Sequence, residues 1–240
     1  MMKTLSGYIL ILLLLPVFIL CAFQTVDEAR QVKSLNEILD KKIKIQDVNL
    51  PQKSAIVDHN GALISNIPGS ESRLYLESRN IPPFLKNIFI VSEDRHFYTH
   101  PGFDLYAIGR AMAVNLKSHG ISQGASTITQ QLARNVFLSQ QRTYNRKLSE
   151  VLYAYQLERS FSKKKILELY LNAIYFQNGA YGIEAAAQKY FNKHIQQLTK
   201  GEQAFLAAIP NNPTLYDPLK HFNFTKARQV RLIDQLRASG

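Results

Sequence analysis

The chain has 240 residues, 46% of them hydrophobic, and a formal net charge of +11 at neutral pH. This length suits one medium-sized domain with appended segments, and the apolar fraction excludes a wholly disordered chain. The positive charge predicts an anionic partner, such as nucleic acid, anionic lipid headgroups or a phosphorylated substrate, without choosing among them.

The N-terminal segment Leu5–Phe23 contains no charged side chain over about the length that spans a bilayer core. Lys3 precedes it and acidic residues follow, which predicts a cytoplasmic N-terminus and an exported body. We expect an uncleaved transmembrane anchor over residues 1–25, with a cleaved signal peptide as the alternative. The only cysteine, Cys21, lies in this run, which excludes a disulfide framework within one chain.

Residues 26–50 are polar and charged with scattered aliphatic side chains, which predicts a linker or helical stalk. Two short apolar runs, Ala55–Val57 and Ala62–Ile64, flank an Asn-Gly step, a strong hairpin pattern. We therefore expect residues 51–240 to form one domain that begins with a small β-hairpin and continues as helices.

Helical spacing of apolar residues dominates the rest of the chain. The expected helices begin near Pro83, Leu105, Thr127, Leu148, Ser162 and Thr199, and a last, basic helix covers Thr225–Leu236. Thr127 with Gln130 three residues later predicts a capping box, and Thr199 with Glu202 repeats the pattern. The fold class expected from these patterns is mainly α.

The first candidate site is the acidic pair Glu93-Asp94, within SEDRHFYTHPGFD. We expect Glu93 at the C-terminal end of a helix, where the helix dipole, Asp94 and desolvation by aromatic side chains would all raise its pKa. A carboxylate of this kind is suited to general acid–base catalysis. The alternative is a solvated pair in an exposed turn.

Two histidines in the same segment, His96 and His100, are four residues apart, as metal ligands can be. No glutamate or cysteine is arranged around them in a ligand pattern. We therefore expect structural hydrogen bonds from both imidazoles, with metal ligation as the alternative, and no metal site is predicted.

The second candidate site is GASTITQQLARN, residues Gly124–Asn135. Ser126 and Thr127 place hydroxyl groups at a helix N-terminus, where free backbone N–H groups favour anions. Gln130 and Gln131 add amide donors on adjacent faces of the helix. The alternative is an ordinary helix cap with solvated glutamines.

The third candidate site combines Arg142, Arg146 and Lys147 with Glu150. Arg146 and Glu150 are one helical turn apart, so one interpretation is a surface ion pair worth a few tenths of a kcal/mol. The other is a cationic rim for a phosphate or diphosphate, with one carboxylate facing it.

Taken in order, five segments resemble the five-motif series of peptidoglycan glycosyltransferases, glycosyltransferase family 51. This family occurs as monofunctional transglycosylases and as the glycosyltransferase domain of penicillin-binding proteins. The segments are Glu93–Asp104, Gly124–Asn135, Arg146–Glu158, Lys163–Phe191 and Leu198–Pro218. The resemblance implies a lysozyme-like, two-lobed fold whose smaller lobe faces the membrane.

The resemblance also implies a reaction, in which lipid II is polymerised into β-1,4-linked glycan with release of undecaprenyl diphosphate. Glu93 would be the general base that deprotonates the acceptor 4-hydroxyl, which attacks the donor sugar with inversion. Glu150 would assist at the donor diphosphate, directly or through a divalent cation (Mg²⁺ or Mn²⁺), and no cofactor is strictly required. The residues implied to bind substrate are Asp94, Ser126, Thr127, Gln130, Gln131, Arg134, Asn135, Arg142, Arg146 and Lys147.

Four positions depart from the family's usual pattern. Arg134 and Asn211 stand where the family commonly has lysine, and Gln177 and Asn192 stand where it commonly has glycine. The first pair affects contacts with phosphate, and the second leaves the shape of two loops open. Neither pair includes the two glutamates.

The expected function is therefore that of a membrane-anchored glycan polymerase in the bacterial inner membrane, with a single span and an extracytoplasmic catalytic domain. Its partners would be lipid II, the growing glycan strand, membrane lipid, transpeptidases and other cell-wall synthesis proteins. A lytic transglycosylase or lysozyme-like hydrolase is a second hypothesis, and a non-catalytic scaffold that binds lipid II is a third. No nucleic-acid recognition motif is present, so nucleic acid is not expected as a partner.

Overall fold

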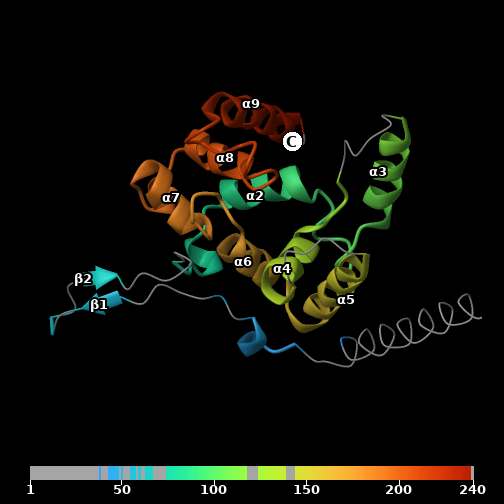
Figure 1. Ribbon diagram of the computed structural model, residues 1–240, viewed down its shortest axis with the longest axis horizontal. Coiled ribbons are helices and arrows are strands. Elements are labelled where there is room, and N and C mark those ends of the chain that lie inside the picture. The colour runs from blue at the N-terminus through green and yellow to red at the C-terminus, as the bar shows by residue number, and fades with distance from the viewer. Residues whose placement is uncertain are drawn as a thin grey trace, which may run out of the picture. The chain divides into compact units, whose positions relative to one another are not determined.

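The chain is mainly helical in the computed structural model (Figure 1). The structure describes residues 38, 43–48, 50, 55–57, 59–60, 63–66, 74–117, 124–138 and 144–238. The expected anchor over residues 1–25 lies outside them, as does most of the expected linker over residues 26–50. Within the described part of the chain, no helix has the length and apolar character needed to cross a bilayer.

Eight α-helices fall within the described residues between Pro83 and Ala238. They are α2 (Pro83–Glu93), α3 (Leu105–Lys117), α4 (Ile128–Phe137), α5 (Tyr144–Ser160), α6 (Lys163–Ala173), α7 (Ile183–Phe191), α8 (Lys200–Ala208) and α9 (Phe222–Ala238). Three 3₁₀ turns accompany them, at Ile45–Asp47, Ser78–Asn80 and Ile195–Gln197. The mainly α fold class is confirmed.

Two short strands pair antiparallel near the start of the domain. Strand β1 (Ala55–Val57) lies beside β2 (Leu63–Asn66), with Ile56 opposite Ser65 and an irregularity in the register after Ile56. The second strand begins one residue later than the sequence pattern indicated.

Local capping explains where several helices begin. At α4 the Gln130 backbone N–H donates to Thr127 Oγ1 at 3.1 Å, and the Thr127 N–H donates to Gln130 Oε1 at 3.0 Å. The predicted capping box is therefore confirmed, as is the one at the start of α8. Helix α7 was not predicted, because its N-cap is Gly182, which has no side chain to bond the first turn.

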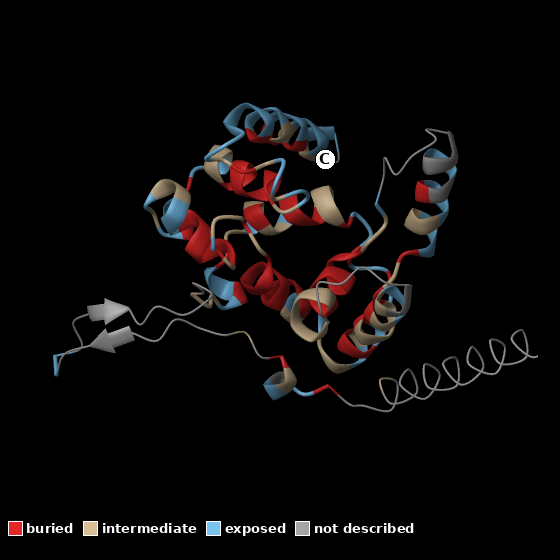
Figure 2. Ribbon diagram, in the orientation of Figure 1, coloured by how far each residue is buried: buried red, intermediate tan, exposed pale blue. Residues whose placement is uncertain are grey.

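The core forms where α4 packs against α5 and α6, and where α2 packs against α8 and α9. Phe89 of α2 is fully buried between two other rings, edge-on to Tyr170 at 6.1 Å and to Phe176 at 6.2 Å between ring centroids. The buried faces of these helices point toward one another and their outer faces are partly or fully exposed (Figure 2). Because α2 is held on both sides, the position of its C-terminal residue, Glu93, is fixed by the core.

The two loops left open by the sequence contain left-handed backbone. Gln177 has φ of 67° and Asn192 has φ of 53°, the region in which glycine is least strained. Asparagine tolerates this left-handed conformation better than most residues, and glutamine does not share that tolerance. The loops thus keep a glycine-type conformation without glycine.

Candidate active site

Glu93 is the last residue of α2, and its side chain is only 6% exposed. Its Oε2 accepts a hydrogen bond of 3.1 Å from Gln131 Nε2 on α4. Its Oε1 accepts no hydrogen bond from the described residues, and Arg228 Nη2 on α9 lies 3.7 Å from it. The alternative of a solvated carboxylate in an exposed turn is therefore wrong.

Burial raises the pKa of Glu93 above its ordinary value, because desolvation disfavours the charged form. The Gln131 hydrogen bond and the positive charges of Arg228 and Arg134 oppose this increase, and the nearby Asp94 adds slightly to it. The expected direction of the pKa is confirmed, with burial as the largest cause. A carboxylate with a raised pKa is a stronger base than a solvated glutamate.

Asp94, the neighbouring acid, is buried and is used to join segments of the protein. Its Oδ2 accepts from the Ile128 backbone N–H at 2.9 Å and lies 2.8 Å from His100 Nε2. The Gly102 N–H donates to His100 Nδ1 at 3.0 Å, so the ring proton is on Nε2 and is donated to Asp94. Thr127 completes the junction by donating from Oγ1 to the Gly102 carbonyl at 2.6 Å. These bonds hold Asp94, the residue next to Glu93, in place, and substrate binding by Asp94 stays a prediction.

Gly102 allows this junction to form against α5. Its φ is 105°, and a Cβ at this position would be 2.9 Å from the carbonyl carbon and oxygen of Ala154. Only glycine fits such a close approach of two backbones.

The two histidines make the structural hydrogen bonds expected of them. His96 Nδ1 lies 2.7 Å from Asp104 Oδ2, and Asp104 Oδ1 also accepts from the Ala107 N–H at the start of α3. No group of three or more potential metal ligands occurs among the described residues.

The two glutamines of the second motif have different surroundings. Gln130 is 2% exposed and its Oε1 is part of the capping box, so its amide serves the helix start. Gln131 bonds Glu93 through Nε2, and its Oε1 lies 3.3 Å from the Tyr170 hydroxyl on α6. Gln131 therefore contacts the candidate base itself, and substrate binding by either amide stays a prediction.

The third motif brings a buried carboxylate beside two cations on α5. The Glu150 side chain is fully buried; Lys147 Nζ pairs with its Oε1 and Arg146 Nη1 lies 3.5 Å from its Oε2. Lys147 Nζ also donates to Ser126 Oγ at 2.9 Å, which links this cluster to the second motif. The alternative of a surface ion pair is wrong for Glu150, because no part of its side chain is exposed.

This arrangement does not match a metal site held by the protein. Mg²⁺ and Mn²⁺ prefer several oxygen ligands, and Glu150 supplies a single carboxylate whose two oxygens already face cations. The described residues around Glu150 therefore do not form a divalent-cation site by themselves.

The first and second motifs border one cavity of about 660 Å³, together with parts of α3 and α9. Of the expected site residues, Glu93, Asp94, Ser126 and Thr127 line it. Sequence reasoning missed Arg228, which also lines it and whose guanidinium lies over the Tyr216 ring at 5.2 Å. The basic character of the last helix was the only indication of this residue. Two further arginines that were not expected, Arg95 and Arg110, also line this cavity.

The last predicted residues to be located are Arg134, Asn135 and Arg142. Arg134 lies in the last turn of α4, near enough to Glu93 to lower its pKa, and Asn135 follows it. Arg142 lies outside the described residues.

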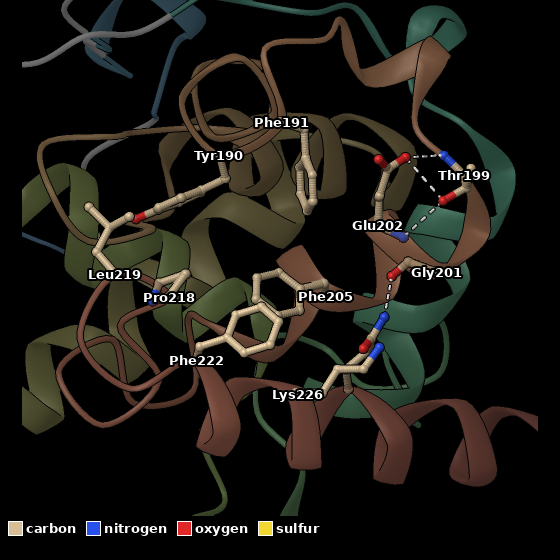
Figure 3. Close-up of a pocket in the computed structure, with 11 residues that line it drawn as sticks. Tyr190, Phe191, Thr199, Gly201, Glu202, Phe205, Pro218, Leu219, Phe222 and Lys226 are labelled. Carbon is tan, nitrogen blue, oxygen red and sulfur yellow. Dashed lines mark hydrogen bonds between the residues drawn. The ribbon is translucent and has the colours of Figure 1, made fainter.

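A second cavity, of about 440 Å³, lies between α7, α8 and the start of α9 (Figure 3). Its walls are mostly aromatic and aliphatic, with Tyr190, Phe205 and Phe222 among them. Its only carboxylate among the described residues, Glu202, is occupied by the α8 cap and by Lys193 at 2.6 Å. This cavity lacks the chemistry of the first.

Comparison with known proteins agrees with this site. A family model described as Transglycosylase matches residues 60–237. The chain belongs to the transglycosylase family. It is thus identified as a peptidoglycan glycosyltransferase domain, and the resemblance seen in the sequence and the enzyme class are confirmed.

Relatives of this transglycosylase domain are penicillin-binding proteins. It is 51% identical to penicillin-binding protein 4 of Bacillus subtilis over 100% of this chain and 39% of the relative. It is 50% identical to penicillin-binding protein 1A of Aquifex aeolicus, over 71% of this chain and 23% of the relative, and 41% identical to penicillin-binding protein 1F of B. subtilis, over 85% and 28%. The chain thus spans less than half the length of these relatives.

A solved structure also aligns with the transglycosylase domain, penicillin-binding protein 1A from Haemophilus influenzae. The alignment covers 79% of this chain and 18% of that chain, with 21% identity and a TM-score of 0.40. This TM-score is too low to support the family assignment, which depends on the family model and the sequence relatives.

Proposed function

We propose that this chain polymerises lipid II into β-1,4-linked glycan and releases undecaprenyl diphosphate. The observation that supports this most strongly is the state of Glu93. One carboxylate oxygen is held by Gln131, the other is buried and accepts no hydrogen bond from the described residues, and Glu93 is among the residues that line a polar cavity. A general base needs one oxygen fixed for orientation and the other available to the proton that it removes.

In the proposed reaction Glu93 removes the proton from the acceptor 4-hydroxyl as the oxygen attacks C1 of the donor sugar. The new C–O bond forms with inversion, and the C1–O bond to the diphosphate breaks with its electron pair on the leaving group. Burial raises the pKa of Glu93, which favours this proton transfer. Gln131 orients the base, and Asp94 supports its helix end.

The departing diphosphate would be stabilised by the cations beside the second and third motifs. Lys147 bonds Ser126 at the cavity edge, and Arg146 accompanies it on α5. We propose that Glu150 acts directly, by holding these two cations in place for the phosphates. The other predicted substrate contacts, from Thr127, Gln130, Arg134, Asn135 and Arg142, belong to the same proposal.

The proposal includes the cellular setting. Residues 1–25 would anchor the chain in the inner membrane with a cytoplasmic N-terminus. Residues 26–50 would link this anchor to residues 51–240, which would form the lysozyme-like, two-lobed catalytic domain with its N-terminal hairpin. The partners would be the growing glycan strand, membrane lipid, and transpeptidases and other cell-wall synthesis proteins. Divalent cations would not be needed.

The test is incubation of the purified full-length chain with fluorescent lipid II in detergent. The expected product is a ladder of glycan that a muramidase digests. Release of soluble fragments from finished cell wall, without new polymer, would instead indicate a lytic enzyme. Binding of lipid II without any product would indicate a scaffold.

A further inference from the structure

Behind Glu93 lies a chain of two hydrogen bonds that ends at a buried tyrosine. Tyr170 of α6 is fully buried, and its hydroxyl donates to Gln131 Oε1 at 3.3 Å. The other end of the same amide, Gln131 Nε2, donates to Glu93 Oε2 at 3.1 Å.

The direction of the Gln131 amide matters for the base. With Nε2 toward Glu93 the carboxylate receives a donor, whereas a flipped amide would place Oε1 against it and repel its charge. A phenol that donates to Oε1 favours the first orientation, because a carbonyl oxygen can only accept.

We propose that Tyr170 is a positioning residue for the general base: its hydroxyl fixes the Gln131 amide so that the amide donates to Glu93. The link to catalysis rests on the function proposed above, whereas the effect on the Glu93 carboxyl does not.

A phenylalanine would fill the same space, so the packing of the ring does not explain the hydroxyl. The ring lies edge-on to Phe89 at 6.1 Å in the core. Burial, and then the nearby charge of Glu93, raise the pKa of Tyr170 well above its ordinary value. The phenol therefore keeps its proton and remains a donor at every pH at which the enzyme would work.

The other groups that face Glu93 come from three elements. Arg134 on α4 and Arg228 on α9 lower the pKa of Glu93, and Asp94 at the end of α2 raises it. None of these is bonded to the Tyr170 hydroxyl in the structure. Removal of this hydroxyl therefore alters the titration of Glu93 through Gln131.

The sign of the effect follows from the hydrogen bond. Gln131 lowers the pKa of Glu93 by donating to its charged form. Loss of a fixed donor raises the pKa further, so a higher pH is needed to deprotonate the base. The acid limb of the pH–rate profile should then move to higher pH, while the rate on the alkaline plateau changes little.

The experiment compares the full-length wild type with Tyr170→Phe in detergent. We expect the acid limb of the pH profile of kcat/KM for lipid II to move to higher pH by about half a pH unit or more, a displacement large enough to measure. Carbon-13 NMR of labelled glutamate, assigned with Glu93→Gln, should give the same displacement for the Glu93 carboxyl without any turnover.

The matched control is Tyr190→Phe, which loses a tyrosine hydroxyl bonded to the Phe176 carbonyl at 2.7 Å, beside the second cavity. It should leave both titrations unchanged. If Tyr170→Phe does not fold, 3-fluorotyrosine at position 170 keeps the shape with a stronger donor and should move the limb to lower pH.

Identical titration of Glu93 in wild type and Tyr170→Phe would overturn the inference. Absence of polymer from the wild type would instead overturn the proposed function, and the NMR titration would still decide the role of Tyr170.

Discussion

Replacement of Lys147 by methionine tests whether Glu150 is a buried charge that depends on its cations. Methionine keeps most of the apolar length of the side chain and removes the ammonium. The variant loses the ion pair with Glu150 and the 2.9 Å hydrogen bond to Ser126. Among the described residues, the Glu150 carboxylate then keeps only its pair with Arg146, 3.5 Å away.

The size of the effect follows from burial. Removing one partner of a buried ion pair costs about 3–5 kcal/mol, because the remaining charge is uncompensated. Lys147 is 46% exposed and Arg146 remains beside Glu150. We therefore expect a loss in the free energy of unfolding below this range, of about 2 kcal/mol. For a chain of this length that corresponds to a fall in Tm of roughly 4–8 °C.

The assay is urea unfolding of the full-length chain followed by circular dichroism. The double variant Lys147→Met/Glu150→Gln should recover most of the lost stability, since it removes the orphaned charge. Lys164→Met, an exposed lysine of α6, is the control and should change the free energy of unfolding by less than about 0.5 kcal/mol. A single variant as stable as wild type, or a double variant no better than the single one, would refute the reasoning.

Three further predictions concern stability. The raised pKa of Glu93 means that stability from this carboxyl is present below its ordinary pKa of 4.5 and is lost as the pH rises toward the raised value. Glu93→Gln should therefore melt higher than wild type at about pH 8, with a smaller difference at about pH 4, and a lower Tm at the higher pH would contradict the pKa direction. Gly102→Ala, whose Cβ would meet Ala154 at 2.9 Å, should lower the free energy of unfolding by about 3 kcal/mol or more. The control Gly109→Ala, with open space around it, should not lower the free energy of unfolding. Equal effects of the two substitutions in urea melts would argue against the close approach. Gln177→Gly should raise the free energy of unfolding by about 0.5–1 kcal/mol, because relief of the strained left-handed conformation outweighs the added freedom of the unfolded chain. A loss of stability would contradict this.

Features encoded by neighbouring residues could be predicted from the sequence. The capping box of Thr127 and Gln130 is a local pattern, and the structure contains both of its bonds. The position of Glu93 at the end of a helix followed from the proline start and apolar spacing of α2. Helix α7 gave no such pattern, because glycine occupies its N-cap and alanines its centre.

Features that depend on packing between distant segments could not be predicted. Arg228 reaches Glu93 only because α9 packs on α2, and nothing around Arg228 in the sequence marks that contact. The choice between a surface ion pair and a buried carboxylate at Glu150 likewise depends on how α4 covers α5. The bond from Tyr170 to Gln131 joins α6 to α4 and has no local pattern.

The role of Glu93 as the general base is tested most directly by the initial rate of lipid II polymerisation in wild type and Glu93→Gln, with Glu77→Gln, an exposed carboxylate beside Arg79, as the control. We predict that Glu93→Gln lowers the rate by about 10²–10⁴-fold while remaining folded, and that Glu77→Gln polymerises at the wild-type rate. A folded Glu93→Gln variant that polymerises within about threefold of wild type would contradict the assignment of Glu93 as the base.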